Sequence, residues 1–283
     1  MAEDIKKLKE ILTTGDATEG SLLIPRKIAD LLVEEVEKAL LPRELARMVH
    51  GPSNIPGSSI DVDLVTKESS VVFRLGEGAA IPLTNPTYES VNIKPVKYGT
   101  RILITREMME DAKWNLLDHA VRMAGKRIAE NETSLILTAL DGATNVVSGG
   151  AAITVANITQ AMNYLITNDY KPTDFIIGAD VLMDLQNIDT FVEFQKAGNT
   201  DMLTRGFLGN IYGMRVHLFS SQVGTATRAY VIDKDNAYDI AEKRPVSVER
   251  YDEPGNDMSG AIVTQRIAVA RIRDAAICRV TTS

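Results

Sequence analysis

The chain has 283 residues, of which 45% are hydrophobic and 24% charged, so disorder, a collagen helix and a coiled coil are excluded for the chain as a whole. Its 31 basic and 38 acidic residues give a formal net charge of −7, which excludes nucleic-acid binding through an overall positive charge. The single cysteine, Cys278, excludes an intrachain disulfide and a metal site built from several cysteines. The start of the chain lacks the apolar segment of a secretion signal, and the uncharged stretch 142–168 is too polar to span a membrane.

The first 50 residues predict an arm followed by a helix. Glycines and threonines interrupt residues 1–22, which contain little apolar material. Pro25 suits the first position of a helix, and Pro42 ends it. Between them, apolar residues recur at three- and four-residue spacing: Ile28, Leu31, Leu32, Val36, Ala39 and Leu40.

Residues 51–100 are rich in turns and in strand-forming residues. Ile60–Val65 alternates apolar and polar side chains, and Val71–Leu75 and Val91–Tyr98 are also extended runs. The segment has few large apolar residues, and an isolated hairpin is marginally stable in water. We therefore expect a two-stranded projection that needs a partner surface.

Residues 101–144 predict the longest helix of the chain. Thr105 is expected to cap a helix that has Glu107 and Glu110 in its first turn. A longer helix from about 115 to 140 would be roughly 40 Å long at about 1.5 Å per residue. One face is expected to be apolar except for Asn131: Leu117, Val121, Ala124, Ile128, Leu135 and Ala139. The rest of its surface is expected to be charged: Arg122, Lys126, Arg127, Glu130 and Glu132.

Residues 145–242 alternate short helices and strands, which predicts an α/β unit. We expect Asn157 to cap a helix over 158–167 and Ile211–Leu218 to form a strand. Residues 243–283 are strand-like and include an acidic turn at 252–257.

The sequence contains no recognisable catalytic or metal-binding motif. His50, His119 and His217 lie in unrelated contexts and are best interpreted as ordinary polar residues. Asp61 and Asp63 are expected to be solvated charges on the projection, and the acidic turn lacks the spacing of a calcium loop. We therefore predict no catalytic residue, no cofactor and no metal, and a function based on association.

Several segments, taken in order, resemble the major capsid proteins of the Hong Kong 97 phage type. The resemblance runs from Ser21 to Thr282. It rests on Leu23-Ile24-Pro25 before a helix, Gly76-Glu77-Gly78-Ala79 with Pro82, the passage from Val91 to Asp111, Gly206–Gly209 leading into Ile211–Leu218, and a final strand pair.

The resemblance implies an α+β Hong Kong 97-like capsid fold with five parts. These are an N-terminal arm and first helix (1–50), an extended loop lying over an adjacent subunit (51–100), a peripheral domain with a spine helix (101–144), an axial α/β domain (145–242) and peripheral strands (243–283). It also implies a structural, non-enzymatic protein that self-assembles as pentamers and hexamers into an icosahedral shell around double-stranded DNA, in a virion assembled in the host cytoplasm. Portal and scaffolding or protease proteins are the further partners expected, and DNA is enclosed without sequence-specific binding.

Two other functions remain open at this point. One is an encapsulin-like cellular compartment that encloses a cargo enzyme, and the other is an α/β enzyme with an unrecognised site. The cross-linking motif of the family's founding member is not matched here, and a scaffold, if needed, is expected as a separate chain. Candidate subunit contacts, chosen for their expected exposure, are Lys67, Arg74, Glu77, Asp252, Glu253 and Asp257.

Overall fold

The computed structural model describes residues 41–282, except 42, 66–71, 79, 81–86, 112–115, 189–209 and 221–222. The predicted arm and first helix, Lys67 and Gly206–Gly209 therefore lie outside the described residues. The described helices are α3 (Arg106–Asp111), α4 (Leu116–Asp141), α5 (Val155–Thr167) and α6 (Ala179–Gln186). The strands are β1 (Met48–His50), β2 (Ile60–Val65), β3 (Tyr88–Ile93), β4 (Val96–Thr105), β5 (Val146–Gly150), β6 (Asp174–Ile177), β7 (Asn210–Ile211), β8 (Met214–Leu218), β9 (Arg228–Ile232), β10 (Tyr238–Glu253), β11 (Met258–Arg271) and β12 (Ile277–Thr282).

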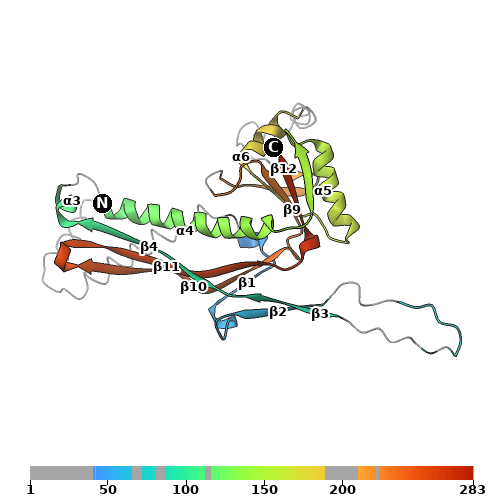
Figure 1. Ribbon diagram of the computed structural model, residues 1–283, viewed down its shortest axis with the longest axis horizontal. Helices are drawn as coiled ribbons and strands as arrows, with labels where there is room; N and C mark the ends of the chain where they lie inside the picture. Colours follow the sequence, from blue (N-terminus) through green and yellow to red (C-terminus); the bar gives the residue numbers. More distant parts are fainter. Residues whose placement is uncertain are drawn as a thin grey trace, which may run out of the picture.

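The strands form three sheets, with strand orders β1-β10-β11-β4, β5-β12-β9-β6-β8-β7 and β2-β3. Helix α4 lies along the long four-stranded sheet, the six-stranded sheet forms a lobe with α5 and α6, and β2–β3 leads into a projection away from both (Figure 1). The predicted α+β class, the long helix and the two-stranded projection are confirmed.

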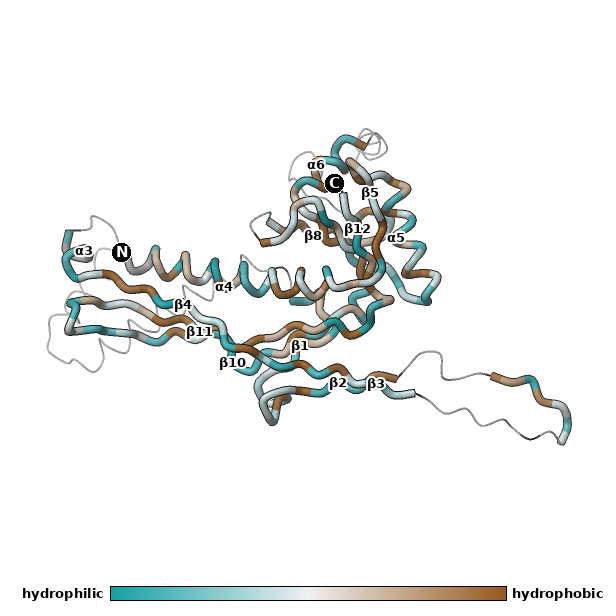
Figure 2. The backbone as a smooth tube through the Cα atoms, viewed as in Figure 1, coloured by the Kyte–Doolittle hydropathy of each residue, from teal (hydrophilic) through white to brown (hydrophobic). Residues whose placement is uncertain are grey.

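Helix α4 packs on one face of the four-stranded sheet. Because side chains alternate along a strand, Val263, Gln265 and Ile267 of β11 face the helix. Figure 2 shows polar residues interspersed with apolar ones along α4, β10 and β11. The buried stripe of α4 differs from the predicted one in its second half, where Ile136 and Leu140 are buried and Leu135 is only partly buried.

Glu132 was predicted on the charged surface of this helix, and that prediction is wrong. Its side chain is fully buried, because it lies one turn from both Ile128 and Ile136 on the stripe that faces the sheet.

The six-stranded lobe is a mixed sheet whose β6 pairs parallel with β8 and antiparallel with β9. Helix α5 covers it with Ile158, Ala161 and Leu165, and the buried Cys278 belongs to this core as a free thiol. The predicted cap of α5 was three residues late. Thr154 is the cap, because its hydroxyl and the side chain of Asn157 satisfy each other's backbone N–H groups.

The strand predicted over Ile211–Leu218 is two strands joined by a turn. Tyr212 and Gly213 have positive φ angles of 50° and 84°, which lets β7 fold back on β8.

Strand pairing assigns the residues of the range 243–283 to two different sheets. Strand β10 runs without a break from Tyr238 to Glu253, across the predicted boundary at 242. The final strand, β12, pairs with β5 and β9 in the six-stranded lobe, although the family resemblance places it among the peripheral strands. Its residues Ile277, Cys278 and Val280 are buried there, which gives the pairing its physical basis.

Strands β2 and β3 pair antiparallel from Ile60↔Ile93 to Val65↔Tyr88. Their inner face buries Val62, Leu64 and Ile93 against small residues on the outer face of the four-stranded sheet, which are Ala241, Ala268 and Ala270. The base of the projection is thus part of the core, and the predicted need for a partner surface concerns only the part of the projection beyond it.

Candidate assembly surfaces

The projection exposes apolar side chains. Tyr88 is 69% exposed and Val72 97% exposed, and Phe73 and Leu75 are also exposed. These residues lie beyond the part of β2–β3 that packs on the body (Figure 1). Because exposed apolar side chains grouped on one segment mark interaction surfaces, this part of the chain is suited to contact with another molecule.

Two of the predicted contact residues, Arg74 and Glu77, lie on this projection. Both are exposed, and neither forms an ion pair with any residue in the described ranges. Lys67 is outside the described residues. The structure therefore brings Arg74 and Glu77 into one exposed segment, and their role as contacts remains a prediction.

The other three predicted residues lie at the far tip of the β10–β11 hairpin and are engaged by their own chain. Asp252 accepts a hydrogen bond of 2.6 Å from Ser259 Oγ. Glu253 lies 3.4 Å from Arg101 Nη2, and Asp257 lies 3.1 Å from Arg106 Nε. The guanidinium of Arg101 also stacks over the ring of Tyr251, 4.7 Å from its centroid. The structure does not bring this tip together with Arg74 and Glu77.

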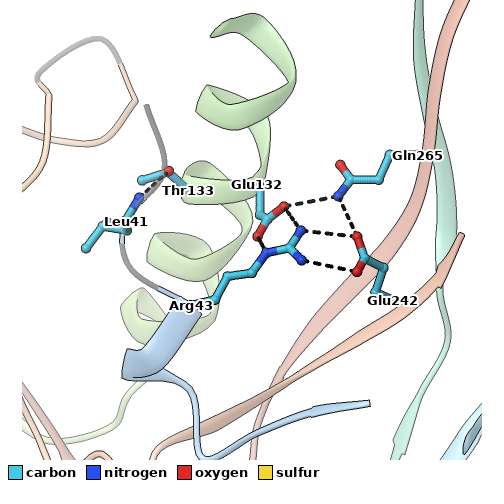
Figure 3. Close-up of polar contacts among 6 residues, drawn as sticks. All are labelled: Leu41, Arg43, Glu132, Thr133, Glu242 and Gln265. Atoms are coloured by element: carbon cyan, nitrogen blue, oxygen red, sulfur yellow. Dashed lines mark hydrogen bonds and ion pairs between the residues drawn. The ribbon is translucent and has the colours of Figure 1, made fainter. Parts of the chain in front are cut away.

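A buried polar layer crosses the interface between α4 and the four-stranded sheet (Figure 3). Arg43 Nε and Nη2 donate to the two carboxylate oxygens of Glu132 at 2.7 and 2.8 Å, and Nη1 and Nη2 donate to Glu242 at 3.1 Å each. Gln265 Nε2 donates to Glu132 at 3.0 Å and to Glu242 at 3.3 Å. One guanidinium and one amide thus hold two carboxylates from different elements.

The charge balance of this layer depends on Arg43. Glu132 is fully buried and Glu242 nearly so, so each carboxylate would be costly without a partner. Hydrogen bonding to Glu132 raises the pKa of Arg43, burial opposes this by lowering it, and the charges of both carboxylates add to the rise. The guanidinium stays charged, and the backbone N–H of Leu41 donates to Thr133 Oγ1 at 3.5 Å beside it. These contacts hold Leu41 and Arg43 against α4.

Sequence reasoning missed this layer. Glu132 lies four residues after Ile128 and four before Ile136, so the apolar spacing of α4 predicts that its side chain points inward. This spacing was the signal in the sequence from which its burial could have been predicted. Its partners, 89 and 133 residues away in sequence, cannot be found from a local pattern.

Two further buried aspartates are each held by an arginine and a histidine. Asp239 accepts from Arg47 at 2.5 and 2.8 Å and lies 3.0 Å from His50 Nε2. Asp174 lies 3.0 Å from both Arg215 Nε and His217 Nε2. These histidines join β1 to β10 and β8 to β6.

No group of three or more His, Cys, Asp or Glu side chains able to hold a metal occurs among the described residues. Within the same residues, no helix has both the length and the apolar character needed to cross a membrane.

Comparison with solved structures defines the class of fold. The chain is similar to a solved structure from Mycobacterium phage Che8, with a TM-score of 0.66 and 13% identity over 79% of this chain and 84% of that one. It is also similar to a virus-like particle from Pyrococcus furiosus, with a TM-score of 0.60 and 12% sequence identity. That match covers 90% of this chain and 98% of the chain of the particle. The fold is that of the Hong Kong 97-like capsid proteins.

Comparison of sequences then gives the family. The phage capsid protein family model matches residues 88–280, which is more than half of the chain. The major capsid protein of Escherichia phage T5 is 26% identical over 206 residues, a match that covers 65% of this chain and 45% of that protein. The chain thus spans about half the length of that relative. It belongs to the phage capsid protein family.

Proposed function

We propose that this chain is the major capsid protein of a tailed phage or provirus. Copies of it assemble as pentamers and hexamers into an icosahedral shell that encloses double-stranded DNA. The observation that carries the proposal is the projection, whose apolar residues Val72, Phe73 and Tyr88 are 97%, 43% and 69% exposed. Covering them with a second copy would bury apolar area at every repeated contact, and such contacts sum over a shell.

In this proposal the chain has a structural role and no catalytic one. The five parts predicted from the sequence serve as arm, extended loop, peripheral domain, axial domain and returning strands, with β12 in the axial part. Portal and scaffolding or protease proteins are further partners, the DNA is enclosed without sequence-specific contacts, and assembly takes place in the host cytoplasm. The encapsulin-like alternative is not favoured, since the family model is that of phage capsid proteins.

The test is to express the chain alone and image the purified protein by negative-stain electron microscopy. Closed shells, or rings of five or six copies, are the expected result. A second experiment co-expresses the chain with a scaffolding protein, because a shell protein that depends on a scaffold forms particles only when the scaffold is present. Monomers in both arms at high concentration would contradict the proposal.

A further inference from the structure

One short segment of the body is held mainly by charged side chains. It runs from Arg43 to His50, contains a 3-10 turn and β1, and we call it the strap. Its backbone attachment is small, because β1 pairs with β10 over only three residues, and Arg47 N–H donates to the carbonyl oxygen of Tyr238 at 2.9 Å. By contrast, β10 and β11 pair along their length. The place of the strap on the body therefore depends on its side chains.

The strap holds β10 from both faces of the four-stranded sheet. Glu242 faces α4, where it accepts hydrogen bonds from Arg43 at 3.1 Å (Figure 3). Side chains alternate along a strand, so Asp239, three residues earlier, lies on the opposite face. There it accepts from Arg47 Nε at 2.8 Å and lies 3.0 Å from His50 Nε2. Since β1 is an edge strand, the strap passes round the edge of the sheet.

Removal of the strap would uncover an acidic groove in the body. The three carboxylates that bind the strap, Glu132, Glu242 and Asp239, are 0%, 9% and 0% exposed. All the ion pairs that these carboxylates form with described residues come from the strap. Gln265 is a further donor to two of them. Without the strap, water would take the place of the lost partners.

An attachment of this kind costs less to release than an apolar one of the same burial. A buried ion pair gains electrostatic energy but loses hydration, and the two terms largely cancel. Leaving the groove restores hydration to both partners, whereas an apolar side chain gains nothing from contact with water. The strap contributes only Leu45 and Ala46 to a cluster of sixteen buried apolar residues, and the other three clusters contain none of its residues. The cores of the body are therefore nearly complete without it.

We propose that the strap opens as a unit while α4 and the two larger sheets stay folded. Local openings of this kind occur in native proteins at free energies below that of global unfolding. Opening would also separate Leu41 N–H from Thr133 Oγ1, so the chain that precedes the strap would no longer be held beside α4. The strap thus acts as a latch for the N-terminal part of the chain. This inference goes beyond the proposed function and does not depend on it, because the latch lies within one chain.

Thiol labelling of the dispersed, folded chain measures the opening. Ala46 is 6% exposed, and Ala46→Cys places a thiol under the strap at the cost of one added sulfur atom. Cys278 is fully buried in the six-stranded lobe, and its reaction reports opening of that lobe. The introduced thiol is expected to react at least tenfold faster than Cys278. Equal rates would overturn the proposal, because the strap would then open only together with the lobe.

Three further substitutions separate opening of the strap from unfolding of the body. Arg43→Met should speed the reaction of the introduced thiol by about tenfold or more, because the closed strap loses its bonds to two carboxylates. Arg101→Met removes an exposed ion pair at the far tip of the hairpin, and this matched control should leave that rate unchanged. Leu165→Ala, in the core of the lobe, should speed the reaction of Cys278 alone. If Leu165→Ala speeds both thiols equally, the strap does not open independently.

Hydrogen exchange of the unsubstituted chain is a second measurement, which holds even if Ala46→Cys fails to fold. The Arg47 amide is expected to exchange at a rate that low urea concentrations change little, because opening the strap exposes little surface. The amide of Val231, in the centre of the lobe, should exchange more slowly and with a steep dependence on urea. The same steep dependence at both amides would contradict the proposal. Both measurements use single chains, so a chain that forms no shells would contradict the proposed function and leave the strap unaffected.

Discussion

Arg43 compensates two buried carboxylates at once, and this makes it the most informative single residue of the body. Removing one partner of a buried ion pair leaves an uncompensated charge, at a cost of about 3–5 kcal/mol. We expect Arg43→Met to lower the free energy of unfolding by about 3 kcal/mol, because Glu132 and Glu242 would then face each other without a cation.

Urea denaturation followed by circular dichroism measures this effect. The matched control is Lys126→Met, which removes an exposed pair with Glu130 and should cost about 0.5 kcal/mol or less. Equal losses in the two variants would show that the polar layer contributes no more than a surface ion pair.

Asp174 gives a prediction about acid stability. Burial alone would raise its pKa, but hydrogen bonds from His217 and Thr173 and the charge of Arg215 outweigh burial, so the pKa is lowered. A lowered pKa means that the folded state binds the proton more weakly than the unfolded state, whose pKa is about 3.9. The stabilisation is therefore fully present above about pH 5 and is lost as the pH falls through the lowered pKa.

We expect Asp174→Asn to be less stable than wild type at pH 6 and to lose less stability between pH 5 and pH 2.5. Chemical denaturation at a series of pH values measures how the free energy of unfolding of each protein changes with pH. Parallel curves for the two proteins would mean that Asp174 is not responsible for this part of the acid sensitivity.

At the scale of elements, the close approach of β11 to β4 depends on Gly260. A Cβ at this position would overlap the carbonyl oxygen of Ile102, which is backbone and cannot move aside without separating the strands. Gly260→Ala is expected to lower the free energy of unfolding by about 2 kcal/mol or more. Gly255→Ala, in the adjacent turn where an added Cβ meets nothing within 4 Å, should change it little. A harmless Gly260→Ala in a thermal or urea melt would contradict this strand packing.

Elements that depend on local pattern were predicted well from the sequence, and those that depend on distant pairing were not. Periodicity located the end of α4 within about one residue, and alternation located β2. The burial of Glu132 and the placement of β12 in the six-stranded lobe depend on partners far away in sequence, which no local window contains.

At the scale of the whole molecule, the described chain consists of a body with its own core and a projection through which we propose that subunits associate. The last paired residues of the projection are Val65 and Tyr88, which are directly opposite each other. Replacing residues 66–87 with Asn-Gly would join them by a two-residue turn of the kind that suits a hairpin. The residues that anchor β2–β3 to the body, Val62, Leu64 and Ile93, would be kept.

The most direct test compares this shortened chain with the wild type under identical conditions, by electron microscopy for assembly and circular dichroism for folding. We predict that both chains melt cooperatively at similar temperatures and that only the wild type forms shells or rings. Shells of normal appearance from the shortened chain would contradict the claim that the projection carries the association between subunits.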